Sequence, residues 1–245
     1  MSNGKVAVVM QPTFLPWLGW FDLADQVNEV ILLDDVEFSK QSWQQRNRIR
    51  TRLGLQYVSV PVVTSGRLGQ LICEAQIHGD YFESKTIKTI NHNYSKSKYF
   101  ECFFEPFCEV LRICAATRNL ADLNCGLIRW LMASLGLDVP VVMASALAVD
   151  GERGWRVASL CRSVSAVQYL STAGAEQYLF EDRRAFEHAA IEVLIHRYDH
   201  PEYGQCYEPF MPYASVLDLL FNEGPGAMSV IRSGRRPARF LIQRD

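Results

Sequence analysis

The sequence lacks a long run of apolar residues, and this absence limits what the chain can be. The first apolar run, Val6–Met10, is too short for a signal peptide. No stretch of the 245 residues reaches the roughly 18 consecutive apolar residues of a membrane span. We therefore expect a cytoplasmic protein with no membrane span.

Net charge and metal-binding patterns are also scarce. The 25 Lys and Arg residues nearly balance the 27 Asp and Glu residues, for a formal net charge of −2. Because nucleic-acid binders are usually markedly basic, this balance argues against a nucleic-acid partner. The seven cysteines include no Cys-x-x-Cys pair, and no cluster of His, Cys, Asp and Glu has metal-ligand spacing. We therefore expect free thiols and no metal site.

The apolar segments that are present alternate between strand and helix patterns. Residues 5–10 have the pattern of a buried strand, 20–27 that of a helix, and 30–35 that of a second strand. A strand, a turn, a helix and a strand within about thirty residues form the unit of a parallel sheet. The sequence therefore predicts the α/β class, with a mostly parallel, Rossmann-like sheet and an inserted helical block.

The order of these patterns predicts how the chain is organised. Residues 1–80 are expected to form an N-terminal α/β half with a phosphate-binding crevice, and 81–136 a helical insertion. Residues 137–245 are expected to complete the same sheet, with 139–147 as one of its strands. The last dozen residues, which carry several arginines, have the composition of a basic tail.

Two helix starts are predicted from capping residues. Asn119 precedes a long helical pattern and is suited to the N-cap position. Ser215 and Asp218 have the spacing of a capping box ahead of an apolar run.

The turn after the first strand, QPTFLPWLGWF, contains two prolines and four large aromatic residues. In a strand–turn–helix unit the amides at the helix start can bind an anion, and Gly19 permits a close backbone approach. Trp17, Trp20 and Phe14 have rings that could stack on a base or a sugar. The alternative is that the aromatic residues fill the core and the prolines only shape the loop.

The next segment, FSKQSWQQRNRIRTRLG, is basic and contains no acid. Three of its arginines, at positions 46, 48 and 50, share one face if the segment is a strand, whereas 48 and 52 share a face in a helix. Guanidinium groups suit phosphate and carboxylate ligands. We therefore expect a phosphate-binding surface here, with a solvated charged face as the alternative.

Three further places carry candidate chemistry. Asp34 lies at the carboxyl end of the second predicted strand, where open α/β sheets bind ligands. The small-residue turn Ser171–Ala175 joins a strand to a helix start, which favours an anion site or else a plain tight turn. In the loop after residue 198, His200 is a candidate base and Cys206 a candidate nucleophile if a base lies beside it. A solvated or structural histidine is the alternative.

Four segments together resemble the bacterial WbqC-like family: QPTFLPWLGWFDLAD, VILLDDVEFSKQSWQQRNRIRT, YLSTAGAEQYL and DHPEYGQCYEPFMPYASVLDLLFNEG. The resemblance covers about residues 6–225 and implies a role in polysaccharide, modified-sugar or secondary-metabolite biosynthesis, without a defined reaction. The family has no fixed cysteine at position 206, which weakens the nucleophile hypothesis. Its pattern matches here at Gln11, Pro12, Pro16, Gly19, Phe21, Asp34, Lys40, Arg46, Asn47, Arg48, His200, Tyr203, Gln205, Ser215 and Asp218.

The predicted architecture is also similar to that of the adenylate-forming nucleotidylyltransferases, pantoate ligase among them. Those enzymes carry a histidine–glycine–histidine signature in the first turn. This chain keeps the glycine in Trp17-Leu18-Gly19-Trp20 but has tryptophans in place of the histidines. The resemblance thus implies either a different chemistry or a transfer of the charge-stabilising task to Lys40 and the arginines.

The first functional hypothesis is a transferase that acts on a small phosphorylated or nucleotide-linked substrate and moves an acyl or aminoacyl group to an amine such as an amino sugar. Its donor would be an acyl or aminoacyl group held as a thioester on a carrier, such as an acyl-carrier protein. His200 is the expected general base, Tyr203 and Gln205 orient the substrate, and Asp34 holds a hydroxyl or the amine. The expected binding residues are Gln11, Trp17, Gly19, Lys40, Arg46, Asn47, Arg48, Ser171 and Gly174.

Two alternative functions remain open from the sequence. One is a ligase or nucleotidylyltransferase that uses ATP and Mg²⁺. The other is a non-catalytic binding protein of a glycan pathway.

Overall fold

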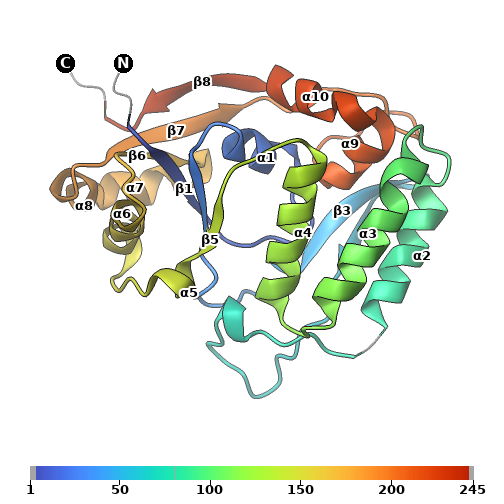
Figure 1. The fold of residues 1–245 in the computed structure, drawn as a ribbon, viewed down its shortest axis with the longest axis horizontal. Coiled ribbons are helices and arrows are strands. Elements are labelled where there is room, and N and C mark those ends of the chain that lie inside the picture. Colours follow the sequence, from blue (N-terminus) through green and yellow to red (C-terminus); the bar gives the residue numbers. More distant parts are fainter. Residues whose placement is uncertain (1–3, 80, 243–245) are drawn as a thin grey trace.

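The computed structural model describes residues 4–79 and 81–242, and its centre is a six-stranded sheet (Figure 1). The order of the strands across the sheet is β5-β2-β1-β6-β7-β8. All neighbouring strands run parallel except β8, which is antiparallel to β7. The predicted α/β class and mostly parallel sheet are therefore confirmed. The strands are β1 (Val6–Met10), β2 (Glu29–Leu32), β5 (Val141–Met143), β6 (Gln168–Ser171), β7 (Glu192–Tyr198) and β8 (Arg235–Phe240).

The strand order reverses direction at the centre of the sheet. The chain proceeds outward from β1 to β2 and β5 on one side, and from β6 to β7 and β8 on the other. Sheets wound in two directions in this way bind ligands outside the carboxyl ends of the strands near the reversal. In this chain those ends are followed by the opening turn after Met10 and by the turn after Ser171.

Alternating residues of β1 face two different cores. Val8 and Met10 belong to the larger core, whereas Ala7 packs with the smaller group on the opposite face. The smaller core is covered by α6 (Arg153–Ser163), α7 (Glu176–Glu181) and α8 (Arg183–His188). The larger core is covered by α1 (Leu18–Ala24), α4 (Leu120–Ser134), α9 (Val216–Glu223) and α10 (Ala227–Ser233).

The helical block lies on one side of the molecule (Figure 1) and consists of α2 (Phe82–Tyr94), α3 (Phe100–Ala115) and α4. Asn119 caps α4 as expected, because its Oδ1 accepts the amide hydrogens of Ala121 and Asp122 at 2.8 and 3.1 Å. Short helical turns occur at α5 (Ala144–Leu147), η1 (Ile72–Glu74), η2 (Ala173–Ala175) and η3 (Gly224–Gly226).

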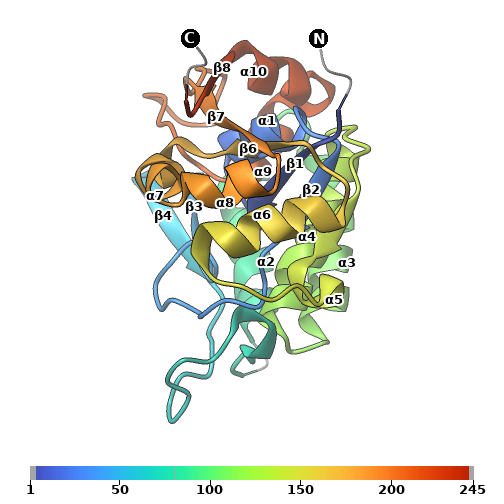
Figure 2. The ribbon, with the colours of Figure 1, turned by 90° about the vertical axis from the view of Figure 1, so that its left-hand side faces the viewer.

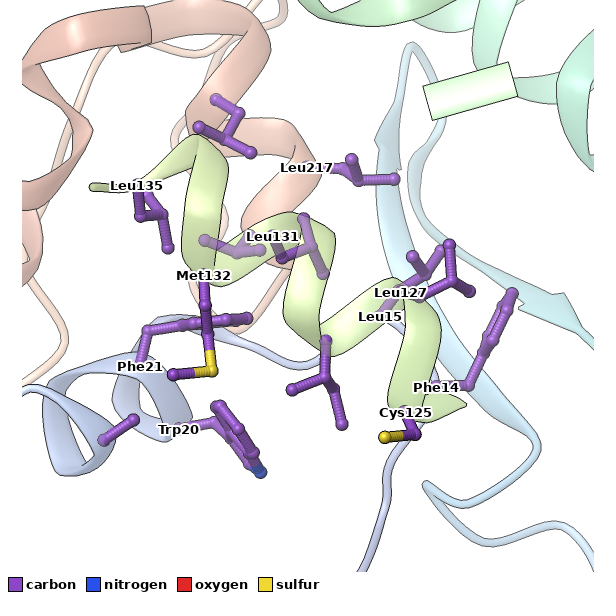
Figure 3. Packing of buried hydrophobic residues seen from close by; sticks show 14 of the residues in the cluster. Phe14, Leu15, Trp20, Phe21, Cys125, Leu127, Leu131, Met132, Leu135 and Leu217 are labelled. Carbon is purple, nitrogen blue, oxygen red and sulfur yellow. The ribbon is translucent and has the colours of Figure 1, made fainter. Parts of the chain in front are cut away.

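Helix α4 packs directly on the opening segment of the chain. Figure 3 shows Phe14 and Phe21 together with Leu131 and Met132 of this helix in one buried cluster. Both phenylalanines are fully buried. Part of the aromatic content of the opening turn therefore belongs to the core, as the structural alternative expected.

The basic segment forms the first strand of a separate hairpin, visible beside the main sheet in Figure 2. Strands β3 (Arg46–Thr51) and β4 (Gly54–Ser59) pair antiparallel, with Arg48 opposite Tyr57. The strand alternative for this segment is therefore the right one, and its arginines at alternate positions share one face of the hairpin.

Three local predictions were wrong. The expected strand at 139–147 ends at Met143, where α5 begins. The expected basic tail is the edge strand β8, which is preceded by the unpredicted helix α10. Ser215 caps α9 through the amide of Leu217, at 3.3 Å, but Asp218 does not complete a capping box because its carboxyl oxygen accepts hydrogen bonds from Tyr203 and Gln205.

Among the helices formed by the described residues, none combines the length and the apolar composition needed to cross a bilayer.

Candidate functional site

A cavity of about 250 Å³ lies beside the carboxyl end of β1. Its walls come from three places that are distant in the sequence: the opening turn with α1, the hairpin with the loop before it, and the loop before α9. The lining residues are Thr13, Trp17, Trp20, Trp43, Asn47, Arg48 and Tyr213.

The opening turn is held in shape by Asn47. The Nδ2 of this asparagine donates hydrogen bonds to the carbonyl oxygens of Phe14, at 3.1 Å, and Leu15, at 2.8 Å. Leu15 has a φ of 46°, a left-handed conformation that costs free energy in a residue with a bulky side chain. The two bonds and the full burial of Leu15 compensate this cost. Asn47 is therefore a positioning residue for the turn.

The side-chain amides of two further residues, Asn124 and Gln44, join the opening turn to neighbouring elements. Asn124 of α4 donates from Nδ2 to the carbonyl oxygens of Pro12, at 2.9 Å, and Gln44, at 2.8 Å. The Nε2 of Gln44 donates to the Oε1 of Gln11 at 2.9 Å. The wall of the cavity is thus tied to the helical block and to the loop that leads into the hairpin.

Two buried hydrogen-bond donors on the lining residues lack a partner among the described residues. One is Nε of Arg48, and the other is Nε1 of Trp20, a side chain that is only 6% exposed. Buried donors are almost always paired in folded proteins, so these two are exceptions in the fold. Arg48 also forms no ion pair with any carboxylate of residues 4–79 and 81–242, and its guanidinium carbon lies 5.4 Å from the ring centroid of Trp43.

Gly19, expected to permit a close backbone approach to a ligand, is in contact with the ring of Trp17. A Cβ at this position would lie 2.3 Å from Cη2 of Trp17, because the indole packs on the glycine backbone. The absence of a side chain at Gly19 thus makes room for the Trp17 ring. The helix that follows, α1, is buried along all of its residues.

His200 packs behind the cavity wall. Its ring stacks on Trp17, with centroids 6.0 Å apart and planes 12° from parallel. Its Nε2 accepts the amide hydrogen of Tyr213 at 3.0 Å, so the ring hydrogen is on Nδ1, which donates to the carbonyl oxygen of Pro201 at 2.9 Å. Burial lowers the pKa of the imidazole, in keeping with this neutral form. Tyr213 has a φ of 66°, and His200 therefore holds both a strained backbone and an indole in place.

Tyr203 and Gln205 belong to the same loop as His200, between β7 and α9, and contact a buried carboxyl. The Tyr203 hydroxyl and the Gln205 Nε2 donate to Oδ2 of Asp218, at 2.7 and 2.8 Å. The Oε1 of Gln205 accepts the amide hydrogen of Met211 at 2.8 Å. Burial raises the pKa of the Asp218 carboxyl, with the hydrogen bonds opposing the shift. These contacts shape the loop that carries His200 and Tyr213, and neither Tyr203 nor Gln205 lines the cavity.

Cys206 has none of the features of an activated thiolate. Its Sγ lies 2.7 Å from Oγ of Ser97 and 3.4 Å from Oδ1 of Asn222, whereas both nitrogens of His200 have other partners. Burial raises the pKa of the thiol, and a raised pKa lowers the population of the nucleophilic form. The structure therefore speaks against the nucleophile hypothesis.

Several expected catalytic and binding residues do not line the cavity. Both carboxyl oxygens of Asp34 accept hydrogen bonds from Ser145, at 3.0 Å from N and 2.6 Å from Oγ, so this aspartate caps α5. Ser171 is buried, and its hydroxyl donates to the carbonyl oxygen of Thr172 at 3.4 Å. The remaining residues outside the lining are Gln11, Gly19, Lys40, Arg46 and Gly174.

Of the expected binding residues, the structure brings Trp17, Asn47 and Arg48 to one cavity. Trp20, which the sequence offered as a stacking ring, also lines the cavity, whereas Thr13, Trp43 and Tyr213 were not among the expected site residues. Thr13 and Trp43 stand in segments that the sequence analysis singled out, so their polar or aromatic character was a usable signal. For Tyr213 the sequence carries no signal beyond the aromatic richness of its loop.

Within the described part of the chain, no three His, Cys, Asp or Glu side chains converge in a way that would hold a metal ion. The seven cysteines are all free.

The fold and the site define an α/β protein with a doubly wound sheet and an aromatic, arginine-containing cavity at its carboxyl edge. The sequence model of the WbqC-like protein family matches residues 11–230, and the chain belongs to this family. It is 34% identical over 233 residues to the uncharacterized protein Rv1507c of Mycobacterium tuberculosis, an alignment that covers 95% of this chain and 99% of that protein. No solved structure matches the chain significantly.

Proposed function

We propose that this protein is a transferase that binds a phosphorylated or nucleotide-linked amino sugar in the cavity and moves an acyl or aminoacyl group to the amine of that sugar. The observation that carries the proposal is that two residues lining one cavity, Arg48 and Trp20, each hold a buried donor, Nε and Nε1, without a partner among the described residues. Membership in the WbqC-like family supports the same general setting of modified-sugar biosynthesis.

The chemical character of the walls supports a sugar phosphate. Arg48, which has no carboxylate partner in the described ranges, suits a phosphate or carboxylate group of the ligand. The rings of Trp17 and Trp43 offer apolar faces for the C–H surface of a sugar. The volume of about 250 Å³ lies just below the ~300–1,000 Å³ typical of ligand cavities, and so suits a group the size of one monosaccharide.

The proposed reaction joins an amine and a thioester. The amine nitrogen attacks the carbonyl carbon, a C–N bond forms, the C–S bond breaks, and the proton lost by the amine is taken up with the released thiolate as a thiol. A tetrahedral oxyanion forms on the way, and an N–H donor in a water-poor site is the group that stabilises such a charge. Trp20 supplies a donor of this kind.

His200 enters this proposal as a positioning residue. Its Nε2 becomes free to accept a proton only if the Tyr213 amide releases it, and Nδ1 already donates to Pro201. Through the Trp17 stack and the Tyr213 bond, the imidazole sets the shape of the wall that faces the ligand.

The binding test is titration calorimetry with glucose 1-phosphate and UDP-glucose. We expect Arg48→Gln to weaken both by roughly 10- to 150-fold, the cost of losing a charge-assisted hydrogen bond of about 1.5–3 kcal/mol. Arg52→Gln is the matched control, because Arg52 is an exposed arginine of the same hairpin and does not line the cavity. Equal affinities for wild type and Arg48→Gln would contradict the proposal.

The turnover test is the release of free thiol from acetyl-CoA in the presence of UDP-glucosamine. We expect release by the wild type that requires the amine, with kcat/KM lowered in Arg48→Gln and unchanged in Arg52→Gln. A protein that binds the sugar nucleotide but consumes no acyl or aminoacyl thioester would be a binding protein of the pathway.

A further inference from the structure

The cavity is too small for a complete nucleotide-linked sugar. Its volume is about 250 Å³, and two of its lining residues, Arg48 of the hairpin and Trp43 of the loop before it, also contribute to the outward side of the hairpin. A substrate that places its sugar in the cavity therefore has to extend over neighbouring surface, and the hairpin face is continuous with the cavity wall.

The outer face of the hairpin (Trp43, Arg46, Arg48 and Tyr57) is a stack of alternating cations and rings. Arg48 is paired opposite Tyr57, and side chains at alternate positions bring Arg46 to the same face. The guanidinium carbon of Arg46 lies 4.3 Å from the Tyr57 ring centroid, and that of Arg48 lies 5.4 Å from the Trp43 centroid. The two rings are 6.2 Å apart, with planes 39° from parallel.

The rings of this face are exposed, and its guanidinium groups have no carboxylate partner among the described residues. Trp43 is 47% exposed and Tyr57 46%, although large aromatic residues usually bury most of their surface. Neither Arg46 nor Arg48 forms an ion pair with a carboxylate within residues 4–79 and 81–242. Exposed rings interleaved with free guanidinium groups are the features with which proteins bind bases and phosphates.

We propose that the outer face of the hairpin is the nucleotide subsite, where the base of a nucleoside diphosphate-linked sugar stacks on Trp43 and Tyr57 while Arg46 and Arg48 bind its diphosphate. The assignment rests on the proposed function, because it takes the sugar to be in the cavity. Stacking tolerates any base, since each has a planar face, and the subsite is therefore expected to favour nucleotides over bare phosphates without a strong preference between uracil and adenine.

The test compares four probes by titration calorimetry: UDP-glucose, UDP, ADP and glucose 1-phosphate. In the wild type we expect UDP and ADP to bind within about threefold of each other. Tyr57→Ala is the decisive variant, because Tyr57 is on the outer face and does not line the cavity. It should weaken UDP and UDP-glucose by roughly 5- to 150-fold, the range seen when one base–aromatic stack is removed, and change glucose 1-phosphate by less than twofold.

Two further variants keep the test independent of a folding defect. Arg46→Gln should weaken UDP but not glucose 1-phosphate, and it leaves both rings intact. Trp155→Ala removes another half-exposed tryptophan, 51% exposed and located on α6, and should change none of the four affinities. Thermal unfolding of each variant shows whether the fold is retained.

The outcomes separate this inference from the proposed function. If glucose 1-phosphate binds in an Arg48-dependent way but Tyr57→Ala and Arg46→Gln bind UDP as the wild type does, the nucleotide subsite is wrong and the sugar-phosphate cavity stands. If no probe binds at millimolar concentration, both are wrong. A loss of UDP affinity in Trp155→Ala as well would show a general effect and would also overturn the subsite.

Discussion

The hairpin segment 46–52 and the C-terminal segment 232–239 each carry four arginines, but the two sets have different partners. In the C-terminal segment, Arg235 donates to Asp22 at 2.8 Å and also pairs with Asp25, and Arg232 pairs with Asp25 at 2.7 Å. Arg236 pairs with Asp199 at 2.8 Å, and Arg239 pairs with Glu176. Every arginine of this segment is therefore neutralised within the fold.

No arginine of the hairpin segment forms an ion pair with a described carboxylate. Arg46 and Arg48 lie against aromatic rings, and Arg52 is exposed. Arg50 is almost fully buried, and its guanidinium donates to the carbonyl oxygens of Thr51, Tyr207 and Pro209 at 2.5, 3.1 and 2.9 Å. This arginine fastens the loop that carries Tyr213 to the hairpin.

The difference shows that the role of a run of arginines, in stability or in binding, depends on the partners of the guanidinium groups. The carboxyl of Asp25 illustrates the structural use: burial would raise its pKa, but the hydrogen bonds from Arg232 and Arg235 outweigh this and lower the pKa. Arg46 and Arg48 of the hairpin have no such carboxylate partner among the described residues. The C-terminal set should therefore control stability, and Arg46 and Arg48 should control binding.

The largest effect is expected for Asp22→Ala. This carboxyl is fully buried and is shared by Arg235 and by Nε2 of His196, at 2.8 and 2.7 Å. Its removal leaves Nε2 of His196 without its partner and leaves Arg235 with Asp25 alone, and it should lower the free energy of unfolding by about 3–5 kcal/mol in urea titrations. The control is Asp199→Ala, whose carboxyl is 70% exposed and should cost less than about 1 kcal/mol. Equal losses of unfolding free energy in Asp22→Ala and Asp199→Ala would contradict the structural role assigned to the buried ion pairs of the C-terminal segment.

The second largest effect is expected for Asn47→Ala, at a residue of the hairpin that lines the cavity and holds the opening turn in shape. The variant leaves the carbonyl oxygens of Phe14 and Leu15 without their donor, and a buried unsatisfied group costs about 1–3 kcal/mol in the free energy of unfolding. Chemical denaturation measures the change. Asn91→Ala, an exposed asparagine on α2, should stay within about 0.5 kcal/mol of the wild type. If Asn47→Ala is as stable as that control, the turn does not depend on this side chain.

The main sheet could be predicted from the sequence, because buried parallel strands are short, nearly continuous apolar runs. Strands β1, β6 and β7 lie where these runs predicted them. Strand β8 could not be predicted this way. It is an edge strand of the pattern Arg-Arg-Pro-Ala-Arg-Phe, and its charges are accommodated by acids such as Glu176, whose proximity depends on the completed fold.

The candidate site could be predicted only where it depends on local spacing. Trp17 follows a strand and Arg48 alternates with its neighbours, so both were identified as binding residues. The place of Tyr213 in the cavity and the burial of Arg50 depend on a loop that is distant in the sequence. The partners of His200, the Tyr213 amide and the Pro201 carbonyl, are backbone groups that no residue pattern indicates.

A smaller effect is expected at His200, where two substitutions separate positioning from proton transfer. His200→Ala removes the acceptor for the Tyr213 amide and should weaken glucose 1-phosphate binding by about tenfold, in line with one hydrogen bond of about 0.5–1.5 kcal/mol. His200→Gln keeps an acceptor and should bind within threefold of the wild type. If His200→Gln binds the ligand but loses turnover, His200 acts as a base after all.

The pH dependence of binding follows from the same histidine. Burial lowers the pKa of His200 below its ordinary 6.5, so the folded state binds fewer protons than the unfolded state between the lowered pKa and 6.5. The contribution of the neutral ring to stability is therefore complete above pH 6.5 and is lost as the pH falls through this window. Protonation of Nε2 also breaks the Tyr213 bond, so ligand affinity should fall in acid for the wild type and less for His200→Gln.

The smallest effect on stability is expected for one arginine from each segment, and this pair gives the sharpest form of the comparison. Arg46→Gln removes an exposed cation–π contact, worth about 0.5–1 kcal/mol, and Arg236→Gln removes an exposed ion pair worth about 0–1 kcal/mol. Their urea midpoints should therefore be nearly equal. Only Arg46→Gln should weaken UDP binding, because the guanidinium of Arg236 is already paired with Asp199 and that of Arg46 has no acid to neutralise it. An equal loss of UDP affinity in both variants would mean that net charge, and not the placement of Arg46 on the hairpin face, governs binding.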